Sequence, residues 1–418
     1  MLRSIVIAIA LSFALRPGQV DAQSDSAFVA WARRTAIPID SSDRAVRSLE
    51  AAVANARLIG VGESVHDRQQ FMELRFELLK ALVQHSHVTA LILESGLPEA
   101  VTVDDYVRGR SDSVDFASHL GPDYNESEVV RQAMTWLREW NRSTGKAHPV
   151  AVYGADISIG DGRSMLPALE RLHAVVGNDP RIGAVLDTLR PLAARVAAAW
   201  WNGAVRNYGA LPDDAKRQLT QLTTQLLAAA RAWRGDTPDE RAWAERFALI
   251  AQQDEVMLRE GPFSAESPRD AAMAANTRWI IDRLPRDERA LVWAHNAHIQ
   301  RVRITGGPVP PGAFPSMGYR LGRDLGDAYF AIGTAYGGPS ADSAGIPRPG
   351  SVDAMFADVS PSPFLLSLRG APRSGAVGAW LSAERPMRFQ VGYITLPLAA
   401  AFDAVVYVDR VSPAVKPP

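Results

Sequence analysis

Residues 57–66 read Arg-Leu-Ile-Gly-Val-Gly-Glu-Ser-Val-His, so a short apolar run passes through two glycines to Glu63 and His66. A run of this length, followed at once by turn residues and then by a helical pattern, is typical of a buried strand in an α/β protein. We therefore expect a strand over Leu58–Val61, with Glu63 and His66 in the turn at its carboxyl end.

The same pattern recurs along the chain. Five further runs rich in β-branched and apolar residues lie between turn residues and amphipathic segments: Val88–Leu93, Val150–Gly154, Ala290–Ala294, Tyr329–Gly333 and Ala404–Val408. Strands that alternate with amphipathic helices form units of a mostly parallel sheet. The sequence therefore predicts an α/β fold in which a mostly parallel central sheet is flanked by helices.

The strand pattern disappears between about residues 165 and 285. Segments there, such as Leu189–Trp201 and Ala215–Trp233, are rich in Ala, Leu and Arg and have helical spacing. We expect this stretch to be a helical insertion within one domain over residues 23–418. We also expect it to form a lid over the C-terminal edge of the strands.

Four of the predicted strands end in an ionisable residue. Glu63 follows the first, Glu94 the second, Asp156 the third and His295 the fourth. In open α/β sheets, ligands bind outside the carboxyl ends of the strands. Each residue alone could be an ordinary helix cap or loop charge, but the four together predict one crevice, with Asp156 assigned to substrate binding.

The spacing of Glu63 and His66 favours acid–base chemistry. Three residues apart in a turn, a carboxylate can orient an imidazole that acts as a general base near neutral pH. Alternatively, either residue caps the next helix. A nucleophilic Ser64 is disfavoured because no Gly-x-Ser-x-Gly motif surrounds it. Nicotinamide binding is disfavoured because Val65 replaces the third glycine of the fingerprint.

The helix expected after this turn carries an arginine within its apolar face. Phe71 and Leu78 belong to the apolar stripe, and Arg75 lies between them at helical spacing. A guanidinium that faces a protein core must be paired with an acceptor. We therefore predict that Arg75 is buried against Glu63 or Glu94.

Two of the eight histidines lie close together in the segment His295-Asn-Ala-His298. Such a pair can supply metal ligands, a base and an electrophile, or one functional and one capping residue. The His-Glu-x-x-His motif of metalloproteases is absent. The chain has no cysteine, so thiolate ligands and cysteine nucleophiles are excluded.

Composition limits the kind of partner. The 418 residues are 47% hydrophobic and 22% charged, which is typical of a globular protein with a sizeable core. Lys and Arg number 45 against 46 Asp and Glu, a formal net charge of -1. This balance offers no broad positive field for nucleic acid. We expect a small-molecule partner; the sequence does not define an oligomeric state.

The first residues resemble an export signal. Arg3 precedes an apolar run over Ser4–Leu15, and small residues stand at Val20 and Ala22. We expect residues 1–22 to be a signal peptide and the mature protein to be periplasmic or secreted. The apolar run is too short to span a bilayer as a helix, so we expect no stable membrane span after processing.

Taken in order, these residues resemble the erythromycin esterase family. The matching pieces are Gly62-Glu63-Ser-Val-His66, Glu73-Leu-Arg75, Leu93-Glu94, Trp136-Leu-Arg138-Glu-Trp-Asn141, Val152–Asp156, Arg269-Asp270, Met273–Asn276, Val292–His298 and Ser316-Met-Gly318. The resemblance covers roughly residues 50–335 and is weak after about Gly337. Asp67 stands where the family most often has Gly.

The resemblance implies a chemistry. That family is known for metal-independent hydrolysis of the macrolide lactone ring, with a histidine as general base on water. Carried over by position, His66 is the base and Glu63 orients it, and the rest of the catalytic set is Arg75, Glu94, His295 and His298. The implied protein is an exported carboxylic ester hydrolase that acts on an ester or lactone and uses no cofactor and no metal.

Two other classes of function stay open on the sequence. The first is a metal-dependent hydrolase or peptidase, because nitrogen and oxygen ligands could come from Glu63, His66, Glu94, His295 and His298. The second is a non-catalytic periplasmic protein that uses the same crevice to bind haem or another apolar ligand.

Overall fold

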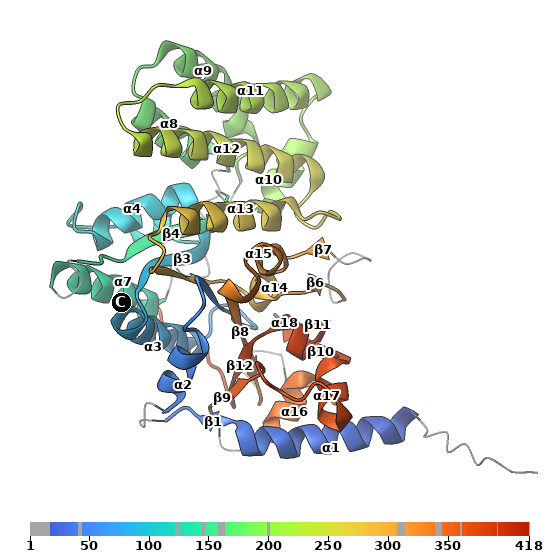
Figure 1. Ribbon diagram of the computed structural model, residues 1–418. Helices are drawn as coiled ribbons and strands as arrows, with labels where there is room; N and C mark the ends of the chain where they lie inside the picture. The colour runs from blue at the N-terminus through green and yellow to red at the C-terminus, as the bar shows by residue number, and fades with distance from the viewer. Residues whose placement is uncertain are drawn as a thin grey trace, which may run out of the picture.

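The computed structural model describes residues 17–40, 44–121, 124, 127–143, 147–157, 164–198, 201–306, 314–338, 345–359, 362–390 and 392–417. Its centre is an eight-stranded sheet with the order β1-β9-β12-β8-β2-β5-β3-β4 (Figure 1). The strands are β1 Ile37–Pro38, β2 Leu58–Val61, β3 Val88–Gly96, β4 Ala151–Asp156, β5 Arg289–Trp293, β8 Tyr329–Tyr336, β9 Phe364–Ser367 and β12 Ala404–Val408.

Six neighbouring strands of this sheet, from β12 to β4, run parallel to one another. The strand β9 is antiparallel to both β12 and β1. All six predicted strands are present, so the predicted α/β fold with a mostly parallel sheet is confirmed. Sequence analysis missed β9, because its residues Phe-Leu-Leu-Ser include no β-branched side chain that would distinguish a short strand from a helix segment.

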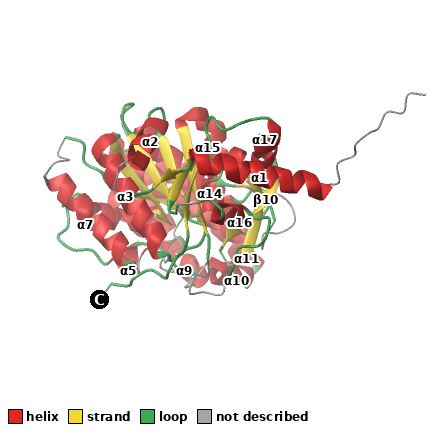
Figure 2. Ribbon diagram, turned by 90° about the horizontal axis from the view of Figure 1, so that it is seen from below, coloured by secondary structure: helices red, strands yellow, loops and turns green. Residues whose placement is uncertain are grey.

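Helices cover both faces of the sheet, which Figure 2 shows enclosed by them. Alternate strand residues point to opposite faces, so Leu58 belongs to one hydrophobic core and Ile59 to the other. On the first face lie α13 Pro268–Arg283, α14 Asn296–Ile299 and α15 Met317–Leu325, and on the second α3 Gln69–His85 and α7 Glu128–Arg142. Burial on both faces explains why these strands read as continuous apolar runs.

Between β4 and β5 the described residues form only helices. They are α8 Leu166–Val176, α9 Pro180–Val196, α10 Trp201–Gly209, α11 Asp213–Ala232, α12 Pro238–Glu260 and α13. Most of this segment lies as a layer beyond the edge strand β4, while α13 packs along β4 (Figure 1). The start of α13 reaches the carboxyl end of β4. That the segment covers a bound substrate stays a prediction.

Two of these helices begin at side chains that cap free backbone N–H groups. Asp179 accepts hydrogen bonds at the start of α9, and Thr237 with Glu240 forms a capping box at the start of α12. The remaining helices are α1 Pro17–Thr35, α2 Arg44–Ala52, α4 Leu97–Val107, α5 Phe116–His119, η2 Gly326–Ala328, α16 Val352–Ala357, α17 Gly375–Ser382 and α18 Leu398–Ala401.

The chain after β8 adds a small module at the β9 end of the sheet. It contains the hairpin of β10 Glu384–Phe389 and β11 Gly392–Pro397. Another short antiparallel pair, β6 Arg303–Ile304 with β7 Phe314–Pro315, comes before β8 in the chain. Helix α1 docks on this module, because Phe28 stacks on Trp380 with ring centroids 3.4 Å apart. The carboxylate of Asp25 accepts a hydrogen bond from the Trp380 indole at 2.9 Å.

Residues 1–16, which make up most of the predicted signal peptide, lie outside the described residues. Across the part of the chain that is described, no helix combines the length and the apolar character needed to cross a membrane.

Candidate active site

The carboxyl ends of four parallel strands meet at one edge of the sheet. The register aligns Val61, the last residue of β2, with Trp293, the last residue of β5, and aligns Trp293 with Leu93 of β3. The strand β4 ends beside β3, where Gly96 is paired with Asp156. This edge therefore carries the side chains that sequence analysis placed there, which are Glu63, Glu94, Asp156 and His295.

The first cluster at this edge is built around the buried carboxylate of Glu63. Its Oε1 lies 2.7 Å from Nδ1 of His66, and its Oε2 lies 3.0 Å from a guanidinium nitrogen of Arg75. Glu63 and Arg75 are fully buried, whereas the His66 side chain is 21% exposed. His66 thus reaches the surface while Glu63 holds its Nδ1 from inside.

This contact determines which nitrogen of His66 can accept a proton. An ionised carboxylate accepts a hydrogen bond from Nδ1–H, so the lone pair of the neutral ring is on Nε2. When Nε2 takes a proton, the adjacent Glu63 charge stabilises the imidazolium. The pair therefore has the arrangement of an oriented general base.

The predicted burial of Arg75 against a carboxylate is confirmed, and the partner is Glu63. Burial alone would lower the pKa of Arg75, but the attraction of Glu63 outweighs it and raises that pKa above its usual value. The guanidinium also donates to the backbone oxygens of Val61 and Ala294, at 3.2 and 2.6 Å. Arg75 therefore acts through Glu63 and the strand ends and does not face a substrate.

The second cluster is built around Glu94. Its Oε1 lies 2.9 Å from Arg269 and 3.2 Å from Nε2 of His298, and its Oε2 accepts the backbone N–H of His295 at 2.7 Å. Nδ1 of His298 lies 2.8 Å from Asp270. Burial would lower the pKa of His298, but the carboxylates of Asp270 and Glu94 raise it to about 10. At neutral pH His298 is therefore a cation and not a base.

Asp156, expected to bind substrate, is fully buried. Its Oδ2 accepts from two nitrogens of Arg269, at 2.8 and 2.6 Å, and its Oδ1 accepts from the backbone of Ile157. Burial raises the pKa of Asp156, and Arg269 opposes that rise. In this geometry Asp156 positions Arg269, whose side chain is 16% exposed, and it is Arg269 that reaches toward the surface.

His295 is buried, and both of its ring nitrogens are used. Nδ1 accepts the backbone N–H of Ala297 at 3.1 Å, and Nε2 donates to the carbonyl of Ser64 at 3.0 Å. Burial, with the nearby His66, holds the pKa of His295 well below its usual value. The ring is therefore neutral, caps α14 and lies beside His66, with centroids 5.0 Å apart.

The five side chains considered as metal ligands do not converge on one point. Within the described ranges, no group of three or more His, Asp or Glu side chains is arranged to hold a metal ion. A ring nitrogen must offer its lone pair to bind a metal. Both nitrogens of His295 are in hydrogen bonds, and both nitrogens of His298 face carboxylates. A metal ion held by all five of these side chains together would require this edge to rearrange.

Sequence analysis quoted Arg269 and Asp270 as part of a motif but assigned them no role. They lie in the first turn of α13, directly after Pro268. Asp270 also accepts hydrogen bonds from Ser267 and from the backbone of Met317, at 2.9 and 2.8 Å. The signal in the sequence that could have identified these residues is an Arg-Asp pair at the start of a helix. A role for the pair could be assigned only once the position of the start of α13 relative to the sheet was known.

The backbone of the turn before α3 has an unusual conformation at position 67. Asp67 has a φ of 56°, in the left-handed region that glycine enters freely. Aspartate is one of the few other residues that visit this region, since its short side chain can bond locally. An aspartate at position 67 is therefore compatible with the left-handed backbone of the turn that carries His66.

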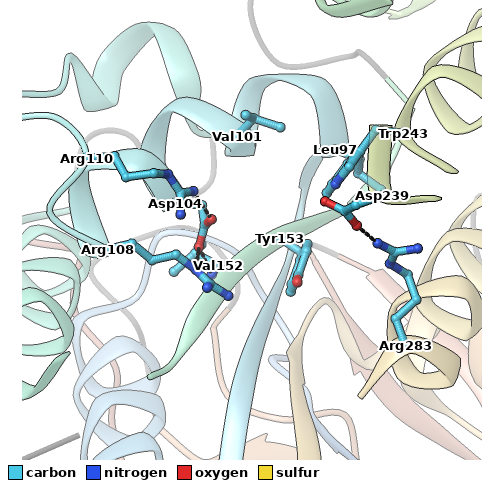
Figure 3. A pocket seen from close by; sticks show the side chains of 10 residues that line it. All are labelled: Leu97, Val101, Asp104, Arg108, Arg110, Val152, Tyr153, Asp239, Trp243 and Arg283. Carbon is cyan, nitrogen blue, oxygen red and sulfur yellow. Dashed lines mark hydrogen bonds and ion pairs between the residues drawn. The ribbon is translucent and has the colours of Figure 1, made fainter. Parts of the chain in front are cut away.

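A separate cavity of about 420 Å³ lies over β4, between α4, α12 and α13 (Figure 3). Tyr153 lies at its centre, and ion pairs join Arg110 to Asp104 and Arg283 to Asp239 at its two sides. Arg283 ends α13, whereas the candidate site lies at the start of that helix. The cavity is therefore not part of the candidate site.

Comparisons with known proteins agree with this architecture. A family model described as Erythromycin esterase matches residues 83–411. Erythromycin esterase type II of Escherichia coli is 22% identical over 428 residues, covering 92% of this chain and 98% of that protein.

Two solved structures share the fold. A Bacillus cereus protein matches with a TM-score of 0.77 and 22% identity, covering 94% of this chain and 99% of that one. A mutant of the erythromycin esterase EreC in its open conformation matches with a TM-score of 0.74 and 19% identity, covering 90% and 96%.

Proposed function

The chain belongs to the erythromycin esterase family, and from that premise we propose that it hydrolyses an ester or lactone by general-base catalysis at His66. The family supports hydrolase activity. The observation that carries the proposed mechanism is the 2.7 Å contact between Glu63 and His66, with Glu63 held by the buried Arg75.

In the first step, Nε2 of His66 takes a proton from a water molecule while the water oxygen bonds to the substrate's carbonyl carbon. The carbonyl π electrons move to oxygen, which gives a tetrahedral oxyanion and an imidazolium. Glu63 accepts the hydrogen bond from Nδ1–H and stabilises that imidazolium. Arg75 holds the Glu63 carboxylate in place at 3.0 Å, so the base and its partner are oriented before substrate arrives.

In the second step, the oxyanion collapses and the bond from carbon to the leaving oxygen breaks. The leaving alkoxide takes the proton from His66, which returns the ring to its neutral form. The products are a carboxylic acid and an alcohol, joined in one ring-opened molecule when the substrate is a lactone. Water attacks directly, so no acyl-enzyme forms.

The oxyanion needs positive charge at the same edge of the sheet. His298 and Arg269 are cations there, with side chains 13% and 16% exposed. We assign transition-state stabilisation to this pair, because fixed charges in a partly dehydrated site interact strongly with developing charge. Glu94, Asp156 and Asp270 hold the two cations in position.

The proposed substrate class is a macrolide lactone, in keeping with the printed name of the E. coli relative. Purified protein incubated with a macrolide should give a product heavier by one water molecule, detected by mass spectrometry. Turnover should persist after dialysis against a chelator, since the proposed base is an imidazole. Loss of turnover that zinc restores would instead assign the metal-dependent class. Ligand binding without turnover of any ester would assign the binding-protein class.

Export is the second part of the proposal. The side chains that dock α1, including Asp25 and Phe28, come after Ala22, so cleavage there keeps these contacts. We expect the form recovered from the periplasm or medium to begin near Gln23. Its intact mass measures this directly, and a mass that includes Met1 would contradict the proposal.

A further inference from the structure

The turn that carries His66, residues 62–68, is held by segments from the far end of the chain. We call it the base turn. It joins β2 to α3, and Asp67 within it has the left-handed conformation described above. Neither a strand nor a helix fixes its backbone, so its geometry depends on contacts from elsewhere.

One residue at the tip of the β10–β11 hairpin makes two hydrogen bonds to this turn. Oε1 of Gln390 accepts the backbone N–H of His66 at 3.3 Å. The backbone N–H of Gln390 donates to the carbonyl of Ser64 at 2.9 Å. Gln390 therefore fixes the backbone on both sides of Val65, immediately before the imidazole.

The hairpin tip and His295 pack together against the same turn. Phe389 contacts the His295 ring edge-on, with centroids 4.8 Å apart. His295 in turn donates to the Ser64 carbonyl, which thus accepts from two sources. Gln390 itself has a φ of 51°, a left-handed conformation that is uncommon for glutamine and that the surrounding contacts must maintain.

The hairpin is a firm support because its other residues are anchored. The backbone N–H of Arg388 donates to the buried carboxylate of Asp353 at 2.8 Å. Near the start of β10, Arg385 forms an ion pair with Asp25 of α1 at 3.0 Å. Because the rest of the hairpin is fixed by these contacts, its tip can hold the base turn in one position.

The C-terminal tail holds the other end of the base turn. The backbone carbonyl of Asp67 accepts the backbone N–H of Ala414 at 3.0 Å, and the backbone N–H of Gln69 donates to the carbonyl of Ser412 at 2.9 Å. The side chain of Gln70 accepts the backbone N–H of Ser412 at 2.7 Å. The start of the turn is held as well, because the backbone carbonyl of Glu63 accepts the backbone N–H of Asn296 at 2.8 Å. Gln390 contacts the part of the turn between these two supports, directly beside His66.

We propose that Gln390 is a positioning residue that sets the location of the general base His66. This inference rests on the proposed function. A misplacement of about 1 Å can cost on the order of 10²-fold in rate, so a backbone contact next to the base has a large effect on catalysis. Gln390 acts through the backbone of the turn and need not touch the substrate.

Two variants and one matched control test the proposal. Gln390→Leu removes the acceptor at similar size, and we expect kcat to fall by about 10-fold or more while KM changes little. Gln390→Glu keeps an acceptor oxygen, so kcat should be largely retained at high pH. Tyr393→Phe removes a hydroxyl that accepts from Arg348, and it lies on the opposite face of the hairpin from Phe389. That control should behave as wild type.

The Gln390→Glu variant also tests the proposal through the pH dependence of the rate, which would not change if Gln390 only stabilised the fold. The added carboxylate favours the imidazolium form, so the rise of rate with pH should shift to higher pH. Other charged or titratable groups already face His66, namely Glu63 from the turn, Glu94 from β3 and His295 at the start of α14. They are unchanged in the variant, so the shift reports the contact with Gln390.

Titration of the His66 ring by NMR separates this inference from the proposed function. The His66 signal is identified by its loss in His66→Ala, and its titration should move to higher pH in Gln390→Glu whether or not any ester is hydrolysed. If Gln390→Leu fails to fold, as judged by circular dichroism, the Gln390→Glu titration decides alone. Wild-type kcat in Gln390→Leu, or an unmoved His66 titration in Gln390→Glu, overturns the proposal.

Discussion

Replacing His66 with alanine should lower kcat for ester hydrolysis by about 10²–10⁴-fold, the range in which general-base assistance usually falls. The ring is held at Nδ1 by a fully buried carboxylate, so no other atom of the first cluster can take the proton from water in its place. KM should change little, because the loss is in the transition state. Steady-state kinetics on one ester with both proteins measures the effect.

The matched control for this experiment is Ser64→Ala in the same turn. The Ser64 side chain is fully buried, and among the described residues its hydroxyl has no hydrogen-bond partner. No base is therefore placed to activate it, and the variant should keep its activity and its stability. An inactive Ser64→Ala together with a trapped acyl-enzyme would transfer the nucleophilic role to serine.

Replacing Arg75 with methionine should lower the free energy of unfolding by about 3–5 kcal/mol, the usual cost of leaving one member of a buried ion pair alone. Glu63 and Arg75 are both fully buried, and the carbonyls of Val61 and Ala294 lose a donor as well. Activity should fall too, because Glu63 would no longer be held against His66. Urea unfolding and kinetics measure the two effects.

Two further variants make this result specific. Arg278→Met removes a surface ion pair with Asp282 in α13 and should change stability by less than about 1 kcal/mol. The double variant Glu63→Gln with Arg75→Met leaves no charge unpaired, so it should recover much of the stability and none of the activity. Full stability in Arg75→Met alone would contradict the argument.

Local sequence patterns predicted the features that depend on neighbouring residues. The run from Leu58 to Val61 is a buried strand because both of its faces are covered, and the pattern showed this. Arg75 was predicted to be buried because helical spacing alone places it between Phe71 and Leu78. Such features need no knowledge of distant segments.

The roles within the site depended on distant segments and were not predictable from spacing. His295 and His298 are three residues apart, yet His295 is neutral because burial and the nearby His66 lower its pKa. His298 is a cation because the carboxylates of Asp270 and Glu94 raise its pKa. Asp156 was placed at the carboxyl edge of the sheet, but its ion-pair partner, Arg269, lies 113 positions later in the chain. Gln390 carries no local signal at all.

The contact between His66 and Gln390 spans 324 positions of sequence. The last strand, β12, lies inside the sheet between β9 and β8. The full sheet therefore cannot form before β12 has been synthesised. Contacts of such long range form late, since the intervening chain must first be ordered. During synthesis the base turn therefore emerges early but acquires its support late, so we expect a nascent chain to gain activity only after Gln390 and β12 have been made.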